Sequence, residues 1–101
     1  MNVTFFDPAE AEFAEAIAYY NLQSEGLGFE FAAEVKRTIG RIIRFPDAWQ
    51  RLSKHTRRVR TNRFPYGIIY QVRSETLLIV AVMHLHRDPE TWKSRIKSEE
   101  L

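Results

Sequence analysis

The residues of this chain best suited to chemistry on a phosphate are arginines and histidines within residues 57–87. Arginine side chains bind phosphate oxygens, and a histidine transfers protons near neutral pH. The candidates for binding a target or a phosphate are Arg58, Arg60, Arg63 and Arg87. Cleavage of RNA by attack of a 2′-hydroxyl needs a proton acceptor, cations for the charge growing on phosphorus, and an acid for the leaving oxygen. Arg58, His84 and His86 are therefore the candidate catalytic residues if the protein is a ribonuclease.

The same residues also have interpretations that involve no catalysis. Basic residues at strand ends more often bind or solubilise than catalyse, and the two histidines can be satisfied strand-end residues. His84 and His86 would share one face of a strand, but without a third ligand nearby we expect no metal site. The chain has no glycine-rich phosphate loop and no convincing Ser-His-Asp order, so we expect no cofactor.

Charge is unevenly distributed along the 101 residues, although the net charge is only +2. Residues 1–35 carry a charge of −7, residues 36–73 carry +10, and the remainder carries −1. Such polarity suggests a basic surface for a polyanion or for an acidic protein partner. The alternative is that acidic and basic elements pack side by side and partly neutralise each other.

Length and composition predict one domain, residues 1–101, with a single core. There is no cysteine, no positively charged leader and no run long enough to span a membrane, so we expect a cytoplasmic protein that does not associate with membranes.

The pattern of apolar residues predicts the elements that would position the candidate site. A strand is expected at residues 2–6, followed by helices at 8–24 and 29–45 that are separated by a Gly-Leu-Gly break. Asp7, Pro8 and Glu10 form the start signal of the first helix, with Asp7 as its N-cap and Glu10 completing a capping box. Glu10, Glu12 and Glu15 are interpreted as solvated helix surface.

The second half of the chain predicts strands. These are a basic strand around Arg57–Arg60, then GIIYQV, a four-residue turn at residues 73–76, and LLIVAVM, before a short C-terminal helix through Trp92 and Ile96. Trp49 is interpreted as a core or edge anchor. The prediction is an α+β fold of order βααβββ, with a helical hairpin on one face of a small, mainly antiparallel sheet. The opposite face is expected to be open and concave, with Arg58 and Arg60 lining it.

Four segments in this order resemble the RelE/ParE superfamily of toxins from type II toxin-antitoxin systems. The segments are EAIAYY, LGFEFAAEV, RRVRTNRFPYGIIYQV and LLIVAVMHLHRDPETW. The resemblance covers nearly the whole chain. It implies a growth-inhibiting toxin, of the kind that contributes to plasmid stabilisation, neutralised by a cognate antitoxin in a heterotetramer or larger complex.

The superfamily implies two possible targets. RelE-like members are ribosome-dependent mRNA interferases, which are metal-independent, whereas ParE-like members inhibit DNA gyrase. An arginine at the end of the last strand and a tyrosine soon after it belong to the RelE pattern, and Leu85 and Trp92 stand at those places here. Leucine cannot bind phosphate and indole cannot exchange a proton. Arg58 does match an arginine of the cleavage pattern, while the AVMH run containing His84 is closer to ParE. The favoured expectation is a gyrase-directed toxin that is not an enzyme, with ribosome-dependent mRNA cleavage as the alternative.

Overall fold

The computed structural model describes residues 1–88 and 90–101 as an α+β fold. Strand β1 (Asn2–Phe5) is followed by helices α1 (Asp7–Gln23) and α2 (Leu27–Arg44) and by strands β2 (Gln50–Arg51), β3 (Arg57–Arg60), β4 (Tyr66–Arg73) and β5 (Thr76–His84). Two 3-10 turns, η1 (Thr91–Arg95) and η2 (Ser98–Glu100), close the chain. The predicted element order is confirmed, with one short strand, β2, added.

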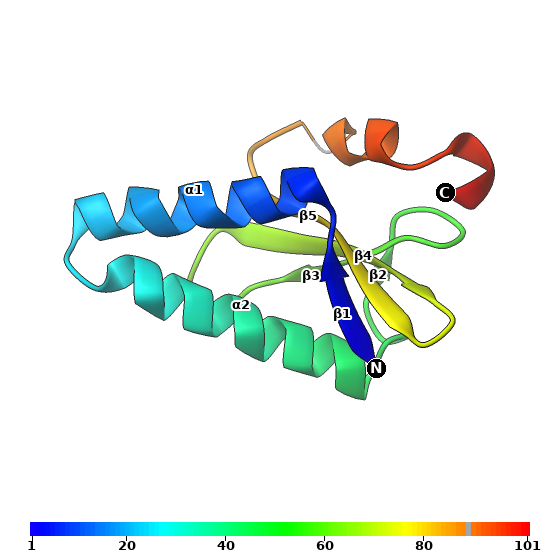
Figure 1. The fold of residues 1–101 in the computed structure, drawn as a ribbon, viewed down its shortest axis with the longest axis horizontal. Helices are drawn as coiled ribbons and strands as arrows, with labels where there is room; N and C mark the ends of the chain where they lie inside the picture. Colours follow the sequence, from blue (N-terminus) through cyan, green and yellow to red (C-terminus); the bar gives the residue numbers. More distant parts are fainter. Residues whose placement is uncertain (89) are drawn as a thin grey trace.

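The five strands form one mixed sheet in the order β1-β5-β4-β3-β2. Strand β1 pairs with β5 in parallel, and the other neighbours are antiparallel. Figure 1 shows α1 and α2 as an antiparallel pair, with the C-terminal turns at the opposite end of the molecule from the tip of the helical hairpin. None of the helices in the described residues combines the length and apolar character that a bilayer crossing requires.

The helical hairpin covers one face of the sheet through an aromatic core. Phe31 is fully buried there, and its ring lies 5.2 Å from those of Tyr20 and Phe64 and 4.8 Å from that of Tyr66. Edge-on and tilted contacts of this kind suit the charge distribution of aromatic rings. The apolar residues of the two helices, including Phe13, Ile17 and Val35, are therefore the ones that pack on the sheet.

The helix boundaries correct two details of the predicted start signals. Helix α1 begins at Asp7, with Phe6 rather than Asp7 at the N-cap, and no side chain makes a capping hydrogen bond. The predicted capping box is therefore wrong. Helix α2 begins two residues earlier than predicted, because Gly26, with φ of 82°, takes the left-handed conformation that glycine adopts without steric cost and lets the chain reverse directly.

The opposite face of the sheet is not open as predicted, because the C-terminal turns lie across part of it. Trp92 and Ile96, both buried, pack there on Ile69, Ala81 and Met83 in a second hydrophobic cluster. The predicted four-residue turn at residues 73–76 is confirmed: Arg73 pairs with Thr76 at its two ends, and Ser74, with φ of 58°, supplies the reversal. Beyond this cluster, Arg58 is partly exposed and Arg60 is exposed.

Tyr70 makes the stability of the fold depend on pH in the alkaline range. Its ring is buried and its hydroxyl donates to the Pro46 carbonyl at 2.6 Å. Burial, opposed by Arg57 and assisted by Asp47, raises the pKa of Tyr70 to about 12 from its ordinary value of 10.0. The fold therefore favours the neutral phenol. Its contribution to stability is complete below pH 10 and is lost as the pH rises from about 10 to about 12.

We expect the stability of the Tyr70→Phe variant to fall less at alkaline pH than that of the wild type. Two pKa units correspond to roughly 2–3 kcal/mol, so the wild type should lose about that much free energy of unfolding over the window and the variant should lose distinctly less. Urea titrations at pH 9 and pH 11.5 measure the difference. Equal losses in both proteins would show that another group controls the alkaline transition.

Candidate functional site

Arg58 lies on β3 and points away from the helices. Its neighbour Val59 is buried in the aromatic core, and side chains alternate along a strand. The stem of Arg58 lies across Gly67, where an added Cβ atom would come within 3.1 Å of Arg58 Cδ and 3.4 Å of Leu85 Cδ2. Gly67 thus allows the arginine stem to lie flat on the uncovered end of the sheet.

A small cavity of about 20 Å³ at this position brings together three of the six predicted residues. Arg58, His84 and Arg87 line it together with Leu85, and we call it the Arg58 cleft. Its volume is about that of one water molecule. Arg60, Arg63 and His86 do not line this cleft.

His84 lines the Arg58 cleft, but its ring lies on the helix side of the sheet. His84 pairs with Tyr66 in the strand register, and the two rings meet edge-on at 5.3 Å. Since Gly67 follows Tyr66, the stem of Arg58 and the ring of His84 leave opposite faces of the sheet. His84 Nδ1 accepts a hydrogen bond from the backbone N–H of His86 at 3.1 Å, which leaves Nε2 as the ring nitrogen available to a solute.

The ring of His84 faces a groove of about 240 Å³ between α1 and β5, which Tyr66 and Glu15 also line. Burial chiefly, and then the neighbouring Tyr20, Tyr19 and Glu12, raise the pKa of Tyr66. The Tyr66 phenol is therefore held neutral. It is a hydrogen-bonding group at neutral pH rather than a base.

Arg87 forms an ion pair with Glu12 of α1. Its Nη1 atom lies 2.9 Å from Glu12 Oε2, and Glu12 also accepts two hydrogen bonds from Arg95 and one from the backbone N–H of Val82 at 3.1 Å. Glu12, interpreted from the sequence as solvated, is instead 10% exposed in its side chain. That interpretation is wrong, because the carboxylate joins α1, β5 and the C-terminal turns.

The two remaining predicted arginines lie apart from the Arg58 cleft. Arg63 has a positive φ of 71° in the loop before β4 and pairs with Glu30 of α2 at 2.6 Å, where both side chains are exposed. Arg60 lies at the outer edge of β3. There it lines a second and larger hollow, together with Arg58.

This second hollow has a volume of about 460 Å³, and we call it the Trp49 hollow. It lies between α2 and the outer edge of β3, and its main lining side chains are Arg41, Trp49, Arg58 and Arg60. Arg41, which comes from α2, was not among the predicted site residues. Trp49 packs against the edge of the core as predicted, but its place beside a cavity was not predicted.

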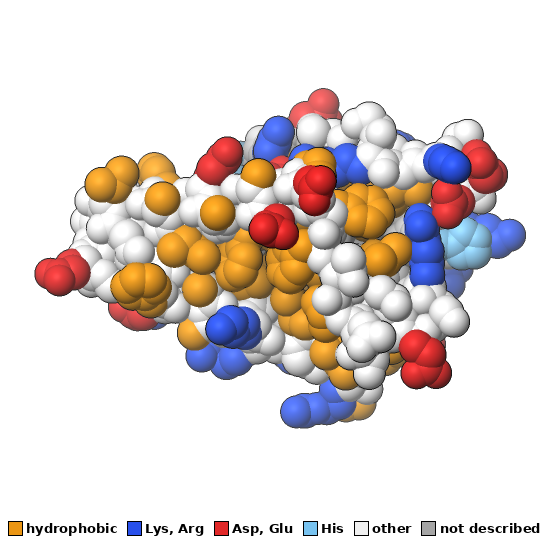
Figure 2. Space-filling model, viewed as in Figure 1, with side chains coloured by type: hydrophobic (Ala, Val, Ile, Leu, Met, Phe, Trp, Pro, Cys, Tyr) orange, Lys and Arg blue, Asp and Glu red, His pale blue; other side chains and the backbone are white. Residues whose placement is uncertain are grey.

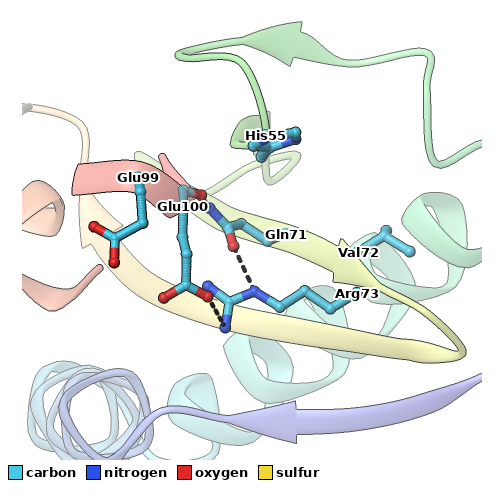
Figure 3. A pocket seen from close by; sticks show the side chains of 6 residues that line it. All are labelled: His55, Gln71, Val72, Arg73, Glu99 and Glu100. Atoms are coloured by element: carbon cyan, nitrogen blue, oxygen red, sulfur yellow. Dashed lines mark hydrogen bonds and ion pairs between the residues drawn. The ribbon is translucent and has the colours of Figure 1, made fainter. Parts of the chain in front are cut away.

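Another cavity, drawn in Figure 3, lies where η2 meets β4, and Arg73 and Glu100 in its lining pair with each other. Arg73 Nη1 pairs with Glu100 Oε2 at 3.2 Å, and Arg73 Nε donates to Gln71 Oε1 at 2.9 Å. Gln71 Nε2 in turn donates to the Glu100 carbonyl at 2.7 Å. These contacts fasten the C-terminal turn to the sheet.

The charge polarity seen in the sequence is partly neutralised in the fold. Glu34 lies within 3.1 Å of Arg37 and 3.7 Å of Arg41. Figure 2 shows acidic side chains over α1, basic ones below α2, and hydrophobic ones gathered between the two helices. In residues 1–88 and 90–101, Arg58 and Arg60 form no ion pair.

Comparisons with known proteins agree with this fold. The family model described as the ParE toxin of type II toxin-antitoxin system, parDE, matches residues 3–89. A solved structure described as the chromosomal ParDE TA system from P. aeruginosa superposes with a TM-score of 0.71 at 12% identity, covering 83% of this chain and 95% of that chain. At such identity this second likeness concerns the fold alone. No curated protein matches the sequence.

Proposed function

We propose that this chain, which belongs to the ParE toxin family of type II toxin-antitoxin systems, inhibits growth by acting on DNA gyrase. A cognate antitoxin would neutralise it, in a heterotetramer or larger complex. Both the target and the partner would place the toxin in the cytoplasm. The family match carries the toxin assignment, and the geometry around Arg58 supports the choice of target.

The observation favouring gyrase over mRNA cleavage is the composition of the Arg58 cleft. Phosphodiester cleavage needs groups that exchange protons beside the cation. Among the described residues, the Arg58 cleft is lined by one titratable side chain besides its arginines, which is His84. The ring of His84 lies on the other face of the sheet. Leu85 lines the cleft but cannot bind phosphate, and Trp92 is only 2% exposed and packed under the C-terminal turns.

The two arginines that form no ion pair among the described residues, Arg58 and Arg60, support binding rather than catalysis. Arg58 and Arg60 lie on the outer part of β3, and a cation without an internal partner attracts negatively charged macromolecules at long range. We propose that these two residues contact the target, with Arg63 and Arg87 contributing less because each already pairs with a glutamate.

Supercoiling of relaxed plasmid by purified gyrase tests the proposal. We expect the toxin to block supercoiling at amounts stoichiometric with gyrase. A variant carrying Arg58→Gln and Arg60→Gln should need at least tenfold more protein for the same inhibition. Lys97→Gln, which removes one exposed cation from the C-terminal turns, is the control and should inhibit as the wild type does.

Two results would count against this function. Unaffected supercoiling at a large excess of folded toxin would exclude gyrase as the target. Cutting of mRNA in a translating extract, lost with Arg58→Gln or His84→Gln, would establish the ribosome-dependent alternative instead.

A further inference from the structure

A separate basic pocket lies where the segment after α2 meets the hairpin of β2 and β3. Its volume is about 190 Å³, much larger than that of one water molecule. The charged side chains that line it are Asp47, Arg51, Lys54 and Arg57, and we call it the Arg51 pocket. The arginines predicted from the sequence to bind phosphate do not line it, and the function proposed above does not use it.

Two arginines of the Arg51 pocket stand directly opposite each other in the sheet. Arg51 of β2 pairs with Arg57 of β3 in the antiparallel register. Like charges at directly opposed positions repel each other and destabilise the pairing. Within residues 1–88 and 90–101, neither these two arginines nor Lys54 or Asp47 form an ion pair. An anion bound between the two arginines would relieve this repulsion.

The charge of the Arg51 pocket specifies the kind of anion. In the part of the chain that the structure describes, three cations and one carboxylate line the pocket, which leaves a charge of +2 when His55 is counted as neutral. A carboxylate would balance only half of this charge, whereas a phosphate monoester approaches a charge of −2 near neutral pH. Guanidinium groups also bind phosphate oxygens through paired N–H donors. A phosphate monoester or diphosphate therefore fits the pocket best.

The backbone around the Arg51 pocket is held in place without a ligand. Arg57 Nη1 donates to the Trp49 carbonyl at 2.8 Å, which orients the guanidinium and leaves its other N–H groups for a ligand. In the turn that carries Lys54, the Leu52 N–H donates to the Thr56 carbonyl at 2.8 Å. Groups that are already oriented lose less entropy when a ligand binds. The pocket is therefore prepared for a small anion.

We propose that the Arg51 pocket binds a terminal phosphate group with two negative charges, as found on a free nucleotide or at the end of a nucleic-acid strand. Arg51 and Arg57 bind its oxygens from the two strands, and Lys54 adds a third positive charge from the turn. A phosphodiester within a strand carries only one negative charge and binds more weakly. This inference does not depend on gyrase being the target of the toxin.

Nuclear magnetic resonance titrations of the full chain, at about pH 8 and constant ionic strength, test the proposal. The probes are methyl phosphate, which is a dianion at this pH, and dimethyl phosphate, which is a monoanion of similar shape. We expect methyl phosphate to shift the backbone amides of Arg51, Lys54 and Arg57 in a saturable way. It should bind at least about fivefold more tightly than dimethyl phosphate. The Arg60 amide, at the Trp49 hollow, is the internal control and should stay unchanged.

Exchange of single charges tests the assignment of the residues. Arg51→Gln and Lys54→Gln should each weaken the binding of methyl phosphate at least about fivefold, because each removes one charged donor. Asp47→Asn should tighten it at least about twofold, because it removes the opposing carboxylate. All three side chains are exposed, so the fold should tolerate these changes. Lys36→Gln removes an exposed cation of α2 outside the pocket and should leave the affinity unchanged.

ADP and oligothymidylate with or without a 5′-phosphate identify the source of the phosphate group. Tightest binding of ADP would assign the pocket to free nucleotides, and tightest binding of the 5′-phosphorylated strand would assign it to strand ends. Equal binding of the two strands, both tighter than methyl phosphate, would overturn the proposal because the ligand would then be the strand's backbone. The proposal would also be wrong if methyl phosphate gave no saturable shift, bound no better than dimethyl phosphate, or bound Arg51→Gln as tightly as the wild type.

Discussion

Replacing Gly28 with alanine is expected to destabilise the protein by at least about 3 kcal/mol, because α1 leaves no room for a side chain there. A Cβ on Gly28 would lie 2.1 Å from the Ile17 carbonyl oxygen and 2.6 Å from Asn21 Cγ. The Asn21 side chain also accepts a hydrogen bond from the Gly28 N–H at 2.7 Å. Since the nearest obstacle is backbone, the helices must separate, and the aromatic core between them loosens.

Gly40 provides the matched control in the same helix. A Cβ there would meet nothing within 4 Å, so Gly40→Ala gains helix propensity and should stabilise by up to about 1 kcal/mol. Thermal unfolding should show the Gly28→Ala midpoint at least roughly 10 °C below that of the wild type, and the Gly40→Ala midpoint at or above it. Similar midpoints for the two variants would contradict the packing described for the hairpin.

Removing the Glu12 carboxylate is expected to release the C-terminal turns from the sheet. Arg95 is 12% exposed in its side chain and lies 2.8 Å from Glu12, so Glu12→Ala leaves a largely buried guanidinium without its counter-charge. Loss of one partner of such a pair costs about 3–5 kcal/mol. The Val82 N–H loses its acceptor as well, so exchange of that amide with solvent should accelerate.

Glu15→Ala is the control for this change, because Glu15 lies one turn further along α1 and is exposed. Its effect should stay within about 0.5 kcal/mol. Limited proteolysis separates local release from global unfolding. In Glu12→Ala, cleavage should begin within the C-terminal turns while the helices stay intact. If both variants resist protease equally, Glu12 does not hold the C-terminal turns in place.

Patterns within short segments predicted most of the fold, because the spacing of apolar residues within a segment determines which helix or strand it forms. The spacing of Phe31, Val35 and Ile42 marks the face of α2 that is buried, and the runs in β4 and β5 are buried as sheet. Strand β2 could not be found in this way. It has two residues, both exposed, and exists only because β3 offers an edge to pair with.

The candidate site was predicted less well because long-range contacts assemble it. A strand pattern gives the face of Arg58, but not that Glu12 lies 2.9 Å from Arg87 across 75 residues of sequence. Nor does a pattern show that Trp92 and Ile96 fold back over the sheet and cover part of the face expected to be open. The Trp49 hollow also joins α2 to the edge of β3, which lie apart in the sequence.

Whether the protein acts on gyrase can be measured by inducing it alone in a bacterial culture and following reporter plasmid topology and mRNA integrity in the same samples. We expect growth arrest in which the plasmid loses negative supercoiling before transcripts shorten, and an attenuated response with the variant carrying Arg58→Gln and Arg60→Gln. Growth arrest with transcripts cut first and plasmid topology unchanged would show that gyrase is not the target.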